Sequence, residues 1–174
     1  PFAEPDRHWV YDTQTGEARQ EAGRRPASYW YKTQRTGSAQ LALLAEEERD
    51  DLPLVNLLRE DVKRWRETNY RNATPVTRQL LAHWSRADRP RRLFFCQREA
   101  VETVIWLHDV RKARDKFDLL RFDASGAVSP KMFDEQWPRY VVKMATGAGK
   151  TKVLSLLIAW SYFHKLYEPD STLS

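Results

Sequence analysis

The feature that most constrains the fold is a glycine-rich stretch, residues 143–151 (K-M-A-T-G-A-G-K-T), set between two apolar segments. A short apolar run, residues 140–142 (Y-V-V), comes before it, and residues 153–160 (V-L-S-L-L-I-A-W) follow it. This order predicts a strand, a tight turn and a helix, which is the context that a phosphate-binding loop requires. The sequence therefore predicts an α/β fold built around an anion-binding turn.

The residues of this stretch suit a nucleotide phosphate. Gly147 and Gly149 can take positive φ at little cost, so the turn can close and point successive backbone N–H groups inward. The helix that follows adds the positive end of its dipole. Lys150 is expected to reach the β- and γ-phosphates, and the Thr151 hydroxyl to ligate Mg²⁺. The predicted contact residues of the loop are Thr146, Gly147, Ala148, Gly149, Lys150 and Thr151.

A second candidate contact lies upstream, at residues 94–100 (F-F-C-Q-R-E-A). The amide of Gln97 is both donor and acceptor, as the N6 and N7 edge of adenine requires. Phe95 and Arg98 are candidates to cover the base or to contact a phosphate. The alternative is that Gln97 is a plain helix-start residue.

These two stretches carry a family resemblance. A strict phosphate loop has glycine where this chain has Met144, and the version A-T-G-A-G-K-T resembles motif I of superfamily 2 helicases and translocases. The Gln97 segment resembles the Q-motif of the same enzymes. Residues 93–174 look like the opening of a first RecA-like domain, most like that of the R (Res) subunit of type III restriction enzymes and related DEAD/DEAH-box proteins.

The resemblance implies the N-terminal part of an ATP-dependent DNA helicase or translocase of a restriction or defence system. It implies ATP and Mg²⁺ as cofactors, and DNA and a modification or specificity subunit as partners. The family's acidic motif and arginine finger have no counterpart here, since Glu168 and Asp170 fall in a loop-like stretch. We therefore expect a fragment of a longer protein that binds nucleotide weakly but does not turn over ATP. The alternatives are a nucleic-acid- or protein-binding module without hydrolysis, or another enzyme with a phosphate loop, such as a kinase.

Composition adds weaker limits. The net charge of +5 permits a nucleic-acid partner without requiring one. A single cysteine excludes an intrachain disulfide and argues against a zinc cluster, which fits a cytoplasmic location. No apolar run approaches the about 18 residues of a membrane span. The longest, residues 154–160, is expected to be a buried helix.

The predicted organisation is a mostly helical module, residues 1–90, followed by the incomplete parallel sheet of the RecA-like domain, residues 91–174, with an insertion at about 109–138. The polar linker 88–92 marks the boundary. Apolar spacing predicts helices at 54–70 and 97–108. Thr74 and Pro75 predict the N-cap and first residue of a helix that continues to about residue 87.

The first residues of the module predict short strands at 8–11 and 29–33, with a turn at 12–16. Their aromatic residues are expected to pack on the helical core. The alternative is that they stack on bases while arginines pair with phosphates. The contact candidates for that alternative are Arg24, Arg25, Trp30 and Lys32.

Overall fold

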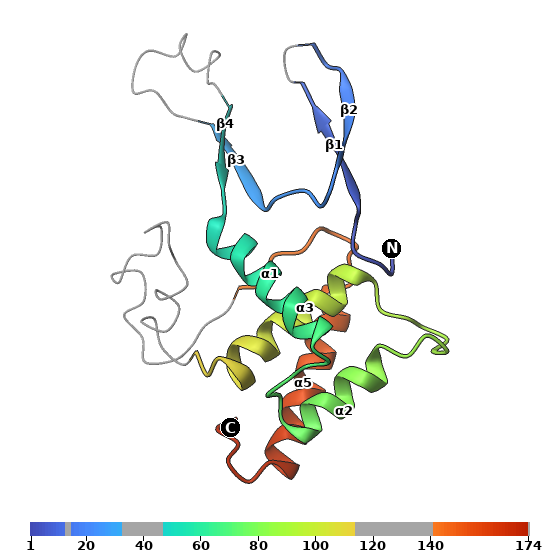
Figure 1. Cartoon of the computed structure of the whole chain (residues 1–174), viewed down its shortest axis with the longest axis vertical. Coiled ribbons are helices and arrows are strands. Elements are labelled where there is room, and N and C mark those ends of the chain that lie inside the picture. Colours follow the sequence, from blue (N-terminus) through green and yellow to red (C-terminus); the bar gives the residue numbers. More distant parts are fainter. Residues whose placement is uncertain (13–14, 33–46, 114–140, 174) are drawn as a thin grey trace.

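Figure 1 shows the computed structural model of the chain, which describes residues 1–12, 15–32, 47–113 and 141–173. The strands are β1 (Arg7–Tyr11), β2 (Ala18–Ala22), β3 (Ser28–Lys32) and β4 (Glu47–Asp51). The helices are α1 (Pro53–Glu67), α2 (Pro75–Trp84), α3 (Phe95–Ile105), the π-helical turn η2 (Trp106–Val110) and α5 (Lys150–Tyr167). The described residues thus form a mixed α/β fold in which helices predominate.

The strands form two antiparallel hairpins, β1 with β2 and β3 with β4. The predicted turn after β1 is confirmed. The Asp12 side chain accepts a hydrogen bond from the Thr15 N–H at 3.1 Å, and Gly16 has a φ of 72°. A short polar contact ties the connection between the hairpins to α1, because the Asn56 side chain bonds both the N–H and the C=O of Ala27, at 2.7 and 3.2 Å.

The expectation that the aromatic residues of the hairpins pack on the helical core was wrong for those that can be described. Trp9, Tyr11 and Tyr29 are 52%, 65% and 42% exposed. Figure 1 shows the reason: both hairpins extend away from the helices, so their faces meet no helix that could cover them.

The helices share one apolar core. The predicted stripe of α1 buries Val62 and Trp65, while Val55, two turns closer to the helix start, is 37% exposed. The remaining core residues come from the segments around and within the other helices: Tyr70, Ala73, Leu81, Trp84, Val101, Ile105, Trp106, Leu107, Ala113, Val153, Leu156 and Trp160. The predicted boundary at 88–92 lies between α2 and α3, both of which contribute to this core.

The start of α2 is formed as the sequence predicts. Thr74 is the N-cap, its hydroxyl accepts a hydrogen bond from the Thr77 N–H, and Pro75 is the first helical residue. The helix ends earlier than expected, at Trp84. Further along, the Trp160 indole N–H donates to the Thr77 hydroxyl at 2.9 Å, which fixes α5 against α2 through a buried hydrogen bond.

Two expectations about the segments around the glycine-rich loop were wrong. Val141 and Val142 are 94% and 38% exposed and form no strand, because no described segment pairs with them. The sheets among the described residues are antiparallel and two-stranded, so a RecA-like parallel sheet is not seen there. In α5, Leu154 and Ile158 are 58% and 61% exposed, because the described helices cover only one side of α5. Most of the expected insertion, residues 114–138, lies outside the described residues.

None of the described helices combines the length and the apolar character that crossing a membrane would require.

A buried carboxylate, that of Glu102 in α3, joins α1 to α3. Its side chain is 0% exposed and accepts hydrogen bonds from the Arg66 guanidinium of α1 at 2.6 and 2.9 Å. Arg98, one turn earlier in α3, donates to it at 2.8 Å, and the Tyr70 hydroxyl donates at 2.6 Å. Burial and the neighbouring Glu102 charge raise the pKa of Tyr70, so this hydroxyl stays protonated as a donor.

Replacing Glu102 with alanine is expected to lower the free energy of unfolding by about 3–5 kcal/mol, because two partly buried guanidinium groups lose their counter-charge. Urea denaturation followed by circular dichroism measures this value. Glu60→Ala is the control: Glu60 lies on the exposed side of α1, and its loss is expected to change stability by less than about 0.5 kcal/mol. Equal effects of the two substitutions would contradict the central place of Glu102.

Candidate functional site

The glycine-rich stretch turns directly into α5. Gly147 has a φ of 78°, and Gly149, the N-cap residue of α5, has a φ of 83° and a ψ of 41°. Both values lie in the left-handed region that glycine adopts without steric cost. Lys150 and Thr151 form the start of α5, where backbone N–H groups have no partner within the helix. The predicted loop residues Thr146 to Thr151 therefore lie together at a helix N-terminus, the geometry that binds anions.

The side chain of Lys150 folds back over the loop. Its Nζ donates to the carbonyl oxygens of Met144 at 3.1 Å and Ala145 at 3.2 Å. The turn is closed by a hydrogen bond from the Ala148 N–H to the Ala145 carbonyl at 3.2 Å. An ammonium group held by two neutral carbonyls has weaker partners than a phosphate offers, since a phosphate oxygen adds the attraction between opposite charges.

Gln97 contacts the loop directly. Its Nε2 donates to the Ala148 carbonyl at 2.9 Å, while its Oε1 accepts from the Phe94 N–H at 3.1 Å and so caps the start of α3. A Cβ placed on Gly149 would lie 2.3 Å from Gln97 Nε2, so the absence of a side chain lets α3 approach the loop. An amide carries two N–H donors and two acceptor lone pairs. One of each remains on Gln97 after these contacts.

The two neighbours predicted to flank the nucleotide are placed differently. The ring of Phe95 is buried between the Arg24 and Arg66 guanidinium groups, 5.3 and 5.2 Å from its centroid. The Arg98 guanidinium bonds Glu102 and the Tyr70 hydroxyl. In this structure Phe95 and Arg98 therefore hold α1 and α3 together. The ring of Phe95 faces the two guanidinium groups, and the N–H donors of Arg98 point to Glu102 and Tyr70.

The structure brings a different aromatic residue to the surface beside Gln97. Phe94 is 42% exposed and its ring lies 5.6 Å from that of Phe2, whose other neighbour is the Arg92 guanidinium at 4.4 Å. Sequence reasoning named Phe95 and missed Phe94. The signal was present in the helix phase, because Phe95 lies seven residues before Glu102 and so shares its buried side, whereas Phe94 is the N-cap residue outside the helix.

The structure also locates two of the four residues that the binding-module alternative names as contacts. Arg24 forms a two-point ion pair with Glu99, with one bond at 2.5 Å, and is only 22% exposed. Arg25 is exposed in the connection between the hairpins. The side chains of Trp30 and Lys32 lie outside what the structure describes.

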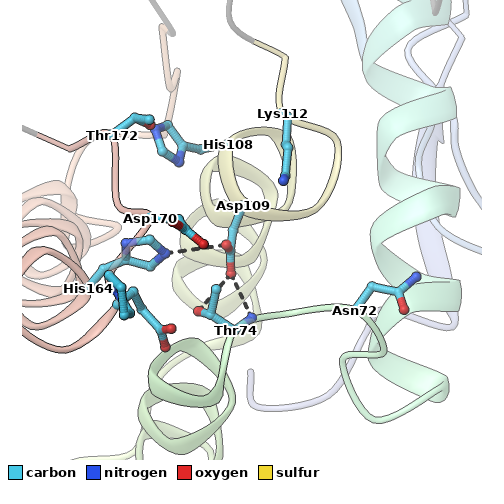
Figure 2. Close-up of a pocket in the computed structure, with 10 residues that line it drawn as sticks. Asn72, Thr74, His108, Asp109, Lys112, His164, Asp170 and Thr172 are labelled. Carbon is cyan, nitrogen blue, oxygen red and sulfur yellow. Dashed lines mark hydrogen bonds and ion pairs between the residues drawn. The ribbon is translucent and has the colours of Figure 1, made fainter.

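A separate polar cavity of about 210 Å³ lies at the opposite end of α5. Figure 2 shows its centre, where the Asp109 carboxylate accepts from the N–H and the hydroxyl of Thr74, both at 3.1 Å, and lies 3.3 Å from His164 Nε2. The Glu168 carboxylate accepts from the Val76 N–H at 2.9 Å. Both carboxylates thus serve the N-terminus of α2, whose dipole favours negative charge.

This cavity is far from the glycine-rich loop, because a helix of 18 residues such as α5 is about 27 Å long. Glu168 lies in the loop-like stretch expected from the sequence, and its role there is to cap a helix. No group of three or more metal-ligating side chains is found among the described residues.

No protein-family model, curated protein or solved structure matches this chain.

A pair of glycine substitutions tests the contact between Gln97 and the loop. Gly149→Ala and Gly147→Ala both impose positive φ on alanine, but only the first also places a Cβ against Gln97, since nothing lies within 4 Å at Gly147. Gly149→Ala is expected to lower the midpoint of thermal unfolding more than Gly147→Ala. Adding Gln97→Ala to each variant is expected to remove most of that difference, as a double-mutant cycle measures. Equal losses for the two glycines would show that the contact is not tight.

Proposed function

We propose that this chain is the nucleotide-binding segment of an ATP-dependent DNA helicase or translocase, with the restriction-enzyme R subunit as the model for its parent. The observation that carries the proposal is the joined pair of elements: a loop with two left-handed glycines opens α5, and the Gln97 amide from α3 bonds the carbonyl of the residue between those glycines. Mixed α/β composition and the basic net charge of +5 agree with it.

The residues present fit a bound nucleotide. The N–H groups at the start of α5 would hold the phosphate oxygens, and the space beside Gly147, where no atom lies within 4 Å of a Cβ position, leaves room for the phosphate chain. Lys150 would exchange its two carbonyl partners for phosphate oxygens. Thr151 would place its hydroxyl on Mg²⁺. When bound, the nucleotide supplies the free energy of phosphoryl transfer.

The adenine would lie against the start of α3. The remaining donor and acceptor of the Gln97 amide match the N6 and N7 edge of adenine. The exposed ring of Phe94, with Phe2 beside it, offers a surface on which the base can stack. In this arrangement Phe94 takes the role that the sequence assigned to Phe95, and Phe95 keeps α1 and α3 in place.

A charge-removal pair tests the phosphate contact. Lys150→Ala is expected to weaken the binding of a fluorescent ATP analogue, in the presence of Mg²⁺, by tenfold or more, which is about 1.4 kcal/mol. Lys152→Ala removes the same charge from an exposed position on the same helix turn and is expected to leave the affinity within about twofold. Equal affinities for the wild type and Lys150→Ala would contradict a phosphate-binding loop.

Base selectivity separates two roles of Gln97. If Gln97 reads adenine, the wild type binds the ATP analogue more tightly than the matched GTP analogue, and Gln97→Ala removes that preference. If Gln97 only holds the loop, the substitution weakens both analogues by the same factor. Cys96→Ala, at an exposed neighbouring position, is the control and is expected to preserve both affinities. We expect loss of the preference, and an unchanged ratio would contradict adenine reading.

A further inference from the structure

The two faces of the hairpin formed by β1 and β2 carry different kinds of side chain. The antiparallel register places Arg7 opposite Ala22, Trp9 opposite Gln20 and Tyr11 opposite Ala18. Because side chains alternate along a strand, these six residues share one face of the hairpin. His8, Val10, Arg19 and Glu21 occupy the other face. We call the first set the aromatic face.

The aromatic face is open. Trp9 and Tyr11 are 52% and 65% exposed, and the small cross-strand residue Ala18 and the polar Gln20 do not cover their rings. Figure 1 shows β1 and β2 extending away from the helical core, so no described helix lies over this surface. The two large rings are not buried against the helical core. Exposed rings that lie side by side favour a partner with flat aromatic surfaces.

Charge on the aromatic face has one sign. Among the strand residues of β1 and β2, its only charged member is Arg7, while the carboxylate of Glu21 lies on the opposite face together with Arg19, its ion-pair partner at 2.9 Å. The Arg7 guanidinium has weak partners, the exposed Asp6 at 3.4 Å and the Gln20 amide oxygen at 3.5 Å. A cation beside two rings, with no strand carboxylate on the same face, complements a phosphate backbone with bases.

The spacing of this row fits bases as well. Alternate residues of a strand are about 6.7 Å apart, which is twice the about 3.4 Å separation of stacked bases. One base can therefore fill the gap between the rings of Trp9 and Tyr11, or successive bases of an extended strand can each meet one ring. Paired bases inside a duplex do not expose their faces, so this geometry requires a single strand.

We propose that the aromatic face, Arg7, Trp9 and Tyr11 of β1 with Gln20 of β2, binds single-stranded DNA. Trp9 and Tyr11 stack on bases, Arg7 pairs with a phosphate, and the Gln20 amide bonds base edges. The choice of DNA rests on the proposed function, whereas the stacking surface itself follows from the hairpin. The site differs from the arginine-rich set Arg24 and Arg25 read from the sequence, since Arg24 is held by Glu99.

Fluorescence anisotropy with a labelled oligothymidine, using the full chain without nucleotide, tests this proposal. Trp9→Ala and Tyr11→Ala are each expected to weaken binding by about fivefold to 150-fold, the effect of losing one base–aromatic stack. Trp9→Phe, which keeps a ring, is expected to restore most of the affinity. Arg7→Gln is expected to lower the slope of log affinity against log salt by about 0.7.

Matched controls make the result specific. Tyr162, on α5, is 64% exposed, almost the same fraction as Tyr11, so Tyr162→Ala removes an equally exposed ring from another element. Arg19→Gln removes a cation from the opposite face of the hairpin. Both are expected to bind oligothymidine as the wild type does. Equal losses from Tyr11→Ala and Tyr162→Ala would overturn the assignment, as would equal binding of duplex DNA that Trp9→Ala does not change.

The same preparations, titrated with the fluorescent ATP analogue, separate this inference from the proposed function. We expect Trp9→Ala to bind the analogue normally and DNA poorly. A wild type that binds the analogue but not oligothymidine would overturn only the aromatic-face proposal. A wild type that binds oligothymidine through Trp9 but not the analogue would overturn only the ATP-binding function. If Trp9→Ala instead abolished self-association seen by sedimentation and left DNA binding intact, the face would be a contact between copies.

Discussion

The buried carboxylate of Glu102 is the interaction on which the helical arrangement depends. It is completely buried, yet it is joined to two guanidinium groups and a hydroxyl, so each of its oxygens has a charged or polar partner. A charge in such a place is costly unless it is paired this fully. The pairing constrains the distance and rotation of α3 relative to α1, because two nitrogens of Arg66 donate to the same oxygen of Glu102.

The rotation of α3 determines which of its side chains reach the glycine-rich loop. With Glu102 turned to α1, the start of the same helix directs Gln97 toward the loop and buries Phe95 between two arginines. Position 149 then favours glycine, because its φ is 83° and a Cβ there would lie 2.3 Å from Gln97 Nε2. A second set of contacts, Trp160 with Thr77 and His164 with Asp109, holds the other end of α5 against α2 and η2. Both ends of α5 are therefore held by polar contacts.

The sequence predicted those parts of the fold that follow from local rules. Apolar spacing located α1 and α3, Thr74 and Pro75 located the start of α2, and the glycine pattern located the turn into α5. It failed where the outcome depends on distant partners. Val141 and Val142 have strand-like side chains but no described strand to pair with, and β propensity without a neighbour does not make a sheet.

The site was predictable to the same degree. The loop residues are brought together because they are adjacent in sequence, and Gln97 lies beside them as the motif suggested. The contacts of Phe95 could not be predicted, because its partners Arg24 and Arg66 are far from it in sequence. The contact of Arg98 with Glu102 was not expected, because both residues are charged and charged residues are usually exposed. The aromatic residues of β1 were expected in the core for the same reason: a pattern of large rings indicates burial unless the position of the hairpin is known.

The contacts of the loop also indicate how it would respond to a nucleotide. Lys150 bonds two carbonyls of the loop itself, and Gln97 bonds a third. Bonds from an ammonium group to phosphate oxygens are stronger than those to neutral carbonyls, so the exchange of partners at Lys150 favours the bound state. Gln97 has no such charge difference to gain, and its bond to Ala148 can persist. In the proposed function Lys150 changes partners, while the bond from Gln97 to Ala148 keeps α3 in contact with the turn.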